Sequence, residues 1–343
     1  MKKAIGTIST DWHIESSTKD QVIKIILQQC ELNEKLGVKD MYCLGDIFNN
    51  RKYQRQDELD ALNYILNMID KRGFNLTAIP GNHDKTMYDS SKSFLDSFKY
   101  HPSFNLVQES CFKIRHGLGI AFIPFFQNDM WLERLNSIKI DKSINNILFS
   151  HIAIEGSINN DGSKVASPIK PSMFMRFDEV YLGHYHNEHD IGANVHHLAS
   201  IRQGNYGDNN KKGFYILYND GSVKFIKSKF KEFVKIKVNL DDISKKELDD
   251  IIRSNINSDN NVRLEFIGDS PKLKTIDKVK LNNFGIDVKT KCKEIEDSID
   301  FIDSNEVQTY GKSEIIVLFT DYCKKNDLDI KTGLFYLNKK FND

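Results

Sequence analysis

Apolar segments alternate with amphipathic helical patterns through the first eighty residues, and this alternation constrains the fold more than any other feature. Short apolar segments at 4–9, 41–44 and 76–79 have the length and residue types of strands. Between them, residues 20–36 and 57–71 carry apolar side chains at helical spacing. A strand–helix–strand–helix–strand order is typical of an α/β sheet, so the sequence predicts an α/β fold.

The later sequence predicts further strands and a second, smaller α/β domain. Strands of the first domain are expected at 119–124, 146–149, 179–182 and 214–218. Strands of the smaller domain are expected at 234–240, 262–267 and 286–291. Ser244 and Glu247 form a capping box that opens a helix, and another helical pattern begins at Ser313. We therefore expect three parts, at residues 1–230, 231–300 and 301–343.

The charge balance and the apolar runs limit the class of protein. The 343-residue chain has 48 Lys and Arg and 48 Asp and Glu, so nucleic-acid binding needs a local patch or a metal site. No apolar run approaches the ~20 residues that span a bilayer, and the start lacks the apolar core of a signal peptide. Five widely spaced cysteines without a CxxC pair fit a reducing compartment. We expect a cytoplasmic protein without a membrane partner.

Side chains able to bind metal follow five of the expected strands. They are, in chain order, Asp11, His13, Asp46, Asn82, His83, Asp84, His151, His184 and His186. Sites in α/β sheets form at the carboxyl ends of strands. Asp11 and His13 are two residues apart, and so are His184 and His186. In an extended segment this spacing puts both side chains of a pair on the same face. The pattern indicates a shared metal site.

Each of these residues alone has an ordinary structural interpretation. Asp11 would serve as a helix cap, Gly45-Asp46 as a turn and His151 as a buried, hydrogen-bonded histidine. His184 and His186 would lie on the face of an edge strand. Their coincidence at strand ends favours the metal site over these alternatives. Imidazole, carboxylate and amide ligands without a thiolate suit Mn, Fe or Zn.

Five motifs occur in order between residues 5 and 190. They read Asp11-x-His13, Gly45-Asp46, Gly81-Asn82-His83-Asp84, His151 and Gly183-His184-x-His186. In this order they resemble the motifs of the calcineurin-like metallophosphoesterase family. The resemblance implies a metallophosphoesterase β-sandwich flanked by helices, and an enzyme that hydrolyses phosphate esters.

The resemblance also implies two divalent metal ions, Mn²⁺ being the expected metal, and gives each residue a role. The first ion would be held by Asp11, His13, Asp46 and His186. The second would be held by Asp46, Asn82, His151 and His184, so that Asp46 bridges the two. His83 would face the phosphate and assist the leaving oxygen, and Asp84 would orient His83. Two such ions activate water and clamp phosphate oxygens.

One segment and the order of the domains resemble SbcD-type exonuclease subunits, a group that includes bacterial and phage recombination endonuclease subunits. The segment is 198–217, in which Asn205-Tyr206-Gly207-Asp208 follows Ala199-Ser200, with Ala199 in place of the usual glycine. Such subunits carry an α/β capping domain and then helices that grip a coiled-coil ATPase. The resemblance implies a DNA exonuclease or endonuclease that works with an SMC-like ATPase in DNA recombination, repair or replication, in a bacterial or phage-infected cell.

Several alternatives stay open at the level of the sequence. The basic stretch between Lys211 and Lys237 is interpreted either as a contact to the DNA backbone or as the solvated face of strands. The C-terminal helix either binds the ATPase or packs as an ordinary helix, and a second copy of the chain is a further candidate partner. The whole protein could also be a stand-alone phosphodiesterase or phosphatase for a small substrate, or a non-catalytic interaction subunit.

Overall fold

The computed structural model describes residues 2–159 and 162–293, and eight further residues at 319–320, 322–324, 329–330 and 334. One compact unit comprises Met1–Phe266 with Asp277–Lys289, and every candidate site residue lies in it. The other unit comprises Ile267–Ile276 with Thr290–Asp343. The helix expected from Ser313 falls almost entirely outside the described residues, and the three-part division at residues 230 and 300 stays a prediction.

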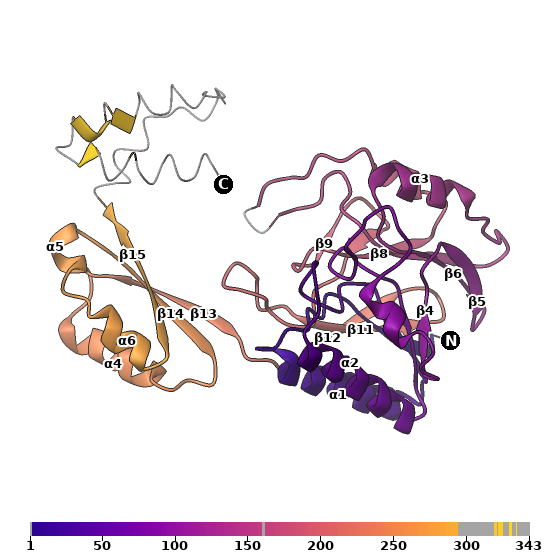
Figure 1. Cartoon of the computed structure of the whole chain (residues 1–343), viewed down its shortest axis with the longest axis horizontal. Coiled ribbons are helices and arrows are strands. Elements are labelled where there is room, and N and C mark those ends of the chain that lie inside the picture. Colours follow the sequence, from indigo (N-terminus) through magenta and orange to yellow (C-terminus); the bar gives the residue numbers. More distant parts are fainter. Residues whose placement is uncertain are drawn as a thin grey trace. The chain divides into compact units, whose positions relative to one another are not determined.

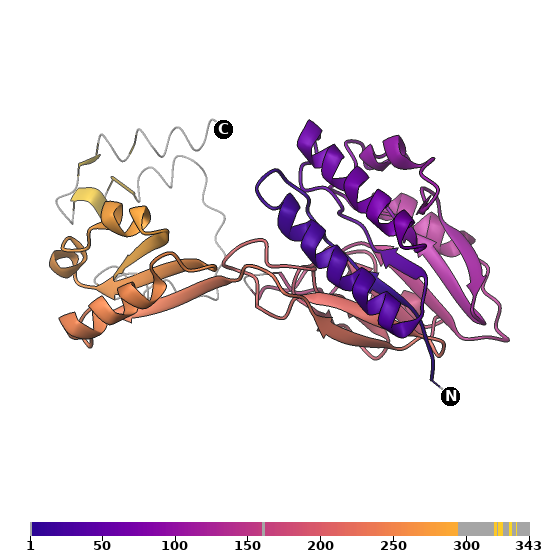
Figure 2. The same ribbon diagram turned by 90° about the horizontal axis from the view of Figure 1, so that it is seen from below.

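The first sheet contains the strands of the alternating N-terminal pattern. Its order is β12 (Val223–Lys227), β11 (Gly213–Tyr218), β1 (Ala4–Ser9), β2 (Asp40–Cys43), β3 (Asn75–Ala78) and β4 (Phe104–Leu106). The strands β1 to β4 are parallel, and β11 pairs antiparallel with β1. Helices α1 (Lys19–Leu36) and α2 (Gln56–Lys71) are the crossovers between the first three strands, and they lie side by side (Figure 1, Figure 2). The predicted strand–helix alternation is confirmed.

The second sheet carries the later strands. Its order is β5 (Cys111–Arg115), β6 (Leu118–Ile123), β7 (Asn146–His151), β8 (Glu179–Gly183), β10 (Val195–His197) and β9 (His189–Asp190). Helix α3 (Asn128–Ser137) lies beside β6 (Figure 1). Two short 3-10 turns, Phe94–Phe98 and Pro171–Phe174, lie in the connecting segments.

The alternation of side chains in the strands divides the core into three layers. In β6, Leu118, Ile120 and Phe122 pack between the two sheets, whereas Ala121 and Ile123 face the layer under α3. In β2, Tyr42 points into the layer between the sheets and Met41 into the layer under α1 and α2. Both sheets are therefore covered on both faces, which is a β-sandwich flanked by helices, as the sequence predicts.

A third, three-stranded sheet follows in the chain. Its order is β13 (Phe233–Asn239), β14 (Asn261–Gly268) and β15 (Ile286–Cys292), with helices α4 (Lys245–Asn255), α5 (Ser270–Leu273) and α6 (Lys278–Asn283). The expected capping box is present, because Ser244 Oγ accepts from Glu247 N at 3.3 Å and Ser244 N donates to Glu247 at 2.9 Å. Within the described part of the chain, no helix combines the length and the apolar character that crossing a bilayer requires.

Candidate metal centre

The two large sheets deliver their polar strand ends to one place. Asp11, Asp46 and Asn82 follow β1, β2 and β3 of the first sheet, and His151 and His184 end β7 and follow β8 of the second. His13 lies two residues after Asp11 and His186 two residues after His184, in loops where Asp11, His13 and His184 have positive φ, so the expected extended conformation is absent there. The structure brings all seven predicted metal ligands together in two adjoining groups that meet at Asp46.

The first group contains Asp11, His13 and His186. Nε2 of His186 lies 2.9 Å from Nε2 of His13, and Nε2 of His13 lies 3.7 Å from Oδ1 of Asp11. Nδ1 of His186 lies 3.2 Å from a carboxylate oxygen of Asp208, which can only accept, so Nδ1 carries the proton and Nε2 presents a lone pair. Two imidazole nitrogens and a buried carboxylate thus point at one spot, which is the donor set of a divalent metal.

The second group contains Asn82, His151 and His184. Oδ1 of Asn82 lies 3.1 Å from Nε2 of His151 and 2.8 Å from Nδ1 of His184. Nδ1 of His151 donates to the Leu44 carbonyl at 2.7 Å, so its Nε2 faces the Asn82 oxygen and Asp46, 3.3 Å away. These ring nitrogens and oxygens converge on one place, where either a proton or a cation satisfies them. The residues therefore fit a metal ion.

Asp46 lies between the two groups. Its Oδ2 is 3.3 Å from Nε2 of His151 and 3.9 Å from Nε2 of His13, and its Oδ1 accepts from the backbone N–H of His83 at 2.8 Å. Burial would raise the pKa of this carboxyl, but the surrounding imidazoles, His151 foremost, hold it well below its usual range. Asp46 is thus an ionised, buried carboxylate in the position that a bridging ligand needs.

Burial raises the pKa of a carboxyl group but lowers the pKa of an imidazole, and the second effect dominates at His184. Burial, together with the neighbouring His151, lowers the pKa of His184 to about 4, so this imidazole is neutral at pH 7. For His151, burial is outweighed by the Asp46 carboxylate, which raises the pKa of His151 to about 9. A proton on His151 thus occupies the place that a metal ion would take, because both satisfy the same ring of acceptors.

The backbone of the site is strained. The φ angles of Asp11, His13, Asp46 and His184 are +52°, +46°, +52° and +95°, in the region that favours glycine. Backbone bonds hold two of these turns, since Asp11 N donates to the Gly45 carbonyl and His13 N to the Asp46 carbonyl, both at 3.0 Å. The loops also pack closely, since a Cβ on Gly183 would lie 2.3 Å from Thr10 Oγ1.

His83 lies at the edge of the two groups and has other partners. Its Nδ1 bonds to the carbonyl of Asn49, so Nδ1 carries the proton and Nε2 accepts from Nη2 of Arg51 at 2.7 Å. Nε2 is 4.0 Å from Oδ2 of Asp46. Burial lowers the pKa of His83. The structure places His83 beside the metal ligands with its ring nitrogens already bonded, and its role facing the phosphate stays a prediction.

Asp84 is fully buried beneath this segment. Its carboxylate accepts from the backbone N–H groups of Gly81 (2.9 Å), Phe48 (3.0 Å) and Ile47 (3.3 Å), rather than from the His83 ring. Burial, together with the charge of Asp46, raises the pKa of Asp84 to about 7. Any orienting effect of Asp84 on His83 therefore passes through the backbone of the two loops that it joins.

Sequence reasoning missed three residues that support the ligands. Asp208 bonds to His186, Thr10 Oγ1 donates to Asp11 at 2.7 Å, and Arg51 contacts His83. Asp208 had a signal in the sequence, because it closes the Tyr206-Gly207-Asp208 pattern. The other two had no such signal, since their contacts depend on how the loops fold.

The other five histidines lie outside the two groups, as expected for surface or core residues. His197 is the nearest and is fully buried, where its ring nitrogens contact Ser157 Oγ and the Gly183 carbonyl. His116 and His196 form ion pairs with acidic residues at the surface.

An α/β sandwich whose strand ends bring together side chains able to bind metal is the arrangement expected of a metal-dependent hydrolase. The family model described as calcineurin-like phosphoesterase matches residues 7–188, more than half of the chain. The chain belongs to this family. The match spans the strands from β1 to β8 and therefore every predicted metal ligand.

Two individual proteins give more distant likenesses. Exonuclease subunit 1 of Enterobacteria phage T4 is 25% identical over 216 residues, and the match covers 60% of this chain and 62% of that protein. One crystal structure superposes on 66% of this chain and 99% of its own, with a TM-score of 0.41 and 10% identity.

Proposed function

We propose that the chain is a metal-dependent DNA nuclease subunit that hydrolyses phosphodiesters. The convergence of four histidines, two carboxylates and one amide on adjoining positions carries this proposal. Membership of the phosphoesterase family and the similarity to a phage protein named as an exonuclease subunit support it. The proposed residues are those of the sequence analysis, with Asp46 between the two metal ions.

The charges of the site favour an anionic substrate. Only Asp11 and Asp46 among the seven ligands are carboxylates, so two divalent cations leave the site with net positive charge. When bound, the ions supply an activated water and neutralise charge on the phosphate oxygens. His83 Nε2 lies at the edge of the site, and to assist the leaving oxygen it would carry a proton in place of the hydrogen bond that it accepts from Arg51. Imidazole and carboxylate ligands suit Mn²⁺, which we propose as the metal.

A paired assay on two substrates tests the proposal. Purified protein with Mn²⁺ is offered linear duplex DNA, single-stranded DNA and a small chromogenic phosphodiester. We expect cleavage of DNA, and elemental analysis should find about two metal ions per chain. Turnover of the small diester alone would favour a stand-alone phosphodiesterase and reject the nuclease. Absence of both metal and activity would favour a non-catalytic interaction subunit.

We also propose an SMC-like ATPase as the partner, in DNA recombination, repair or replication in the cytoplasm. The word subunit in the name of the phage relative supports a complex, and the C-terminal residues 301–343 are the proposed contact. A pull-down for a large coiled-coil ATPase should succeed with the full chain and fail after deletion from Ser313, while both proteins bind metal. Equal capture of the ATPase by the full chain and by the truncated protein would reject the C-terminal contact. Size-exclusion chromatography with light scattering would show whether two copies associate.

A further inference from the structure

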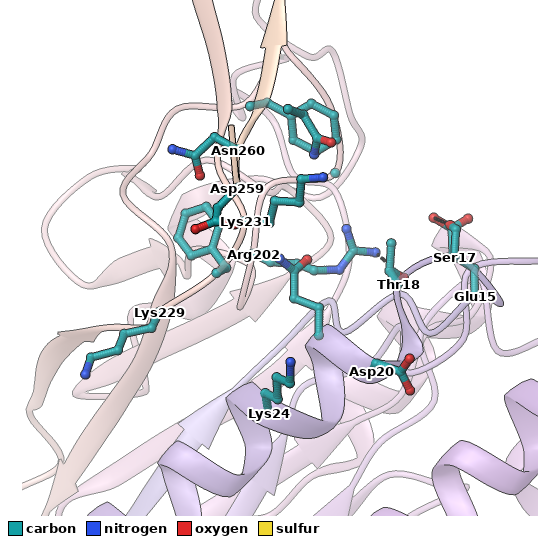
Figure 3. Close-up of a pocket in the computed structure, with 15 residues that line it drawn as sticks. Glu15, Ser17, Thr18, Asp20, Lys24, Arg202, Lys229, Lys231, Asp259 and Asn260 are labelled. Atoms are coloured by element: carbon teal, nitrogen blue, oxygen red, sulfur yellow. Dashed lines mark hydrogen bonds between the residues drawn. The ribbon is translucent and has the colours of Figure 1, made fainter. Parts of the chain in front are cut away.

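A groove of about 690 Å³ is lined by residues of α1, of the segment between β12 and β13 and of the segment around Arg202 (Figure 3). One end of it is formed by residues that touch the proposed ligands. Arg202 Nη2 donates to the carbonyl of His13 at 2.9 Å, and Gly204 lies where an added Cβ would be 3.6 Å from the ring of His186. The lining of the groove therefore contacts the backbone of His13 and comes close to the ring of His186.

The other end of the groove carries exposed lysines without ionic partners. Lys24 extends from α1, and Lys229 and Lys231 extend from the segment between β12 and β13 (Figure 3). Their ammonium groups form no ion pair or hydrogen bond with any residue that the structure describes. By contrast, two other lysines of the basic stretch form ion pairs, Lys211 with Glu188 and Lys227 with Glu232.

The wall that carries these lysines is held in place. Gln28, one helical turn after Lys24, binds the backbone of Lys229 twice, by accepting from its N–H at 2.8 Å and donating to its carbonyl at 3.1 Å. Two residues after Lys231, the N–H of Phe233 donates to the Gln203 side chain at 2.8 Å. The positive charges therefore stand on a fixed surface rather than on a loose loop.

The remaining charged side chains of the lining include carboxylates as well as an arginine, so the positive charges of the groove are separated from one another. Arg202 is only 5% exposed, and its Nε has no hydrogen-bond partner in the described part of the chain. Three carboxylates also line the groove, Glu15, Asp20 and Asp259. Glu15 is already bonded, because it accepts from the Asn49 side chain at 2.8 Å. A ligand that suits such a lining carries separated negative charges, as the phosphates of a nucleic-acid strand do.

We propose that this groove binds the phosphate backbone of the single DNA strand next to the scissile phosphodiester, through Lys24, Lys229 and Lys231. The proposal rests on the nuclease function proposed above and assigns a path to its substrate. It also decides between the two interpretations of the basic stretch, because only part of that stretch lines the groove. Phe230 and Phe233, both half-buried, share the lining and add apolar surface on which bases can rest without a sequence preference.

A matched pair of triple variants tests the groove. The groove variant is Lys24→Gln, Lys229→Gln and Lys231→Gln. The control variant is Lys224→Gln, Lys235→Gln and Lys237→Gln, which removes the same charge from three exposed lysines outside the groove. Binding of a fluorescent single-stranded oligonucleotide is measured by anisotropy with EDTA over a range of salt concentrations. Cleavage of the same oligonucleotide, and of the small chromogenic diester, is measured with Mn²⁺.

The expected result is specific to the groove variant. Its slope of log K against log salt should become shallower by about 2, since each lost phosphate contact removes roughly 0.7. Its ratio of oligonucleotide to small-diester turnover should fall at least about tenfold, while the control variant keeps the ratio and slope of the wild type. If the wild type binds and cuts the oligonucleotide but the two variants behave alike, the groove is rejected alone. If the wild type hydrolyses only the small diester and does not bind the oligonucleotide, the nuclease function and the groove are both rejected.

Discussion

The metal ligands and the residues around them differ in what their removal should do. Asp46 touches both groups of ligands, whereas His83 has its ring nitrogens bonded to Asn49 and Arg51. A ligand shared between two ions affects binding of both. A residue that acts on the leaving oxygen affects only turnover.

The first prediction contrasts substitutions of these two residues. Asp46→Ala should lose both metal ions, because its carboxylate lies between the two groups. His83→Gln should keep the metal and lose turnover by about 10²–10⁴-fold, the usual contribution of general acid–base catalysis. Metal content is measured by elemental analysis and turnover with the DNA oligonucleotide, whose alkoxide leaving group needs a proton. An Asp46→Ala protein that still binds two ions would contradict the assignment.

Asp208 gives a second prediction. Its carboxylate fixes the ring of His186 and also accepts from Gly204 N at 2.7 Å. Asp208→Ala should weaken metal binding by roughly 10–100-fold, the range found for residues that orient a ligating histidine. Asp208→Asn keeps an oxygen acceptor and should lose less. Titration of metal into the apoprotein measures both, and equal affinities in all three proteins would refute the role.

At the level of elements, the site depends on how closely the strand ends approach. Gly183 ends β8 and lies against β1 and β2, where an added Cβ would be 2.3 Å from Thr10 Oγ1 and 2.6 Å from the Leu44 carbonyl. The second sheet therefore meets the first at a residue without a side chain. The approach also lets His151 donate to Leu44.

A third prediction follows for this contact. Gly183→Ala should destabilise the fold by about 1–3 kcal/mol through overpacking, and should weaken metal binding because His184 moves. Gly204→Ala is the control for stability, since its Cβ would meet neighbours only at ordinary contact distances of 3.4 Å or more. Denaturant unfolding of both variants measures the difference, and equal stabilities would contradict the packing argument.

The elements with a strong periodic pattern were predictable from the sequence. Helices α1 and α2 and the strands β1, β2, β3 and β7 agree with the expectation within a few residues. Strands β4, β5, β9, β10 and β12 and helix α3 were not predicted. The strands among them are short or partly exposed, so neither composition nor alternation distinguishes them from loops.

The site was predictable for a related reason. Parallel strands put their carboxyl ends at one edge, so ligands that follow strands can be located without coordinates. The supporting contacts of Arg51 and Thr10 come from loops. Their positions depend on tertiary packing, which no local pattern in the sequence encodes.

For the whole molecule, the metal centre joins the two large sheets. Asp11, Asp46 and Asn82 come from the first sheet, and His151 and His184 from the second. Metal ions bound between them would act as cross-links of the sandwich.

The fourth prediction is that the metal stabilises the entire fold. Metal at about 100 times its dissociation constant should add roughly 2.7 kcal/mol to the free energy of unfolding, and EDTA should remove it. Thermal unfolding with and without metal measures the shift. Asp46→Ala should show no shift, and a wild type that unfolds at the same temperature in EDTA would argue against metal ions between the sheets.

The left-handed backbone at four of the proposed ligands sets backbone energy against metal binding. Glycine at positions 11, 13, 46 or 184 would relax a local strain of order 1–3 kcal/mol each, and would delete a proposed ligand. Such a substitution should therefore stabilise the apoprotein, whereas in the presence of metal it would forgo the stabilisation that bound ions supply.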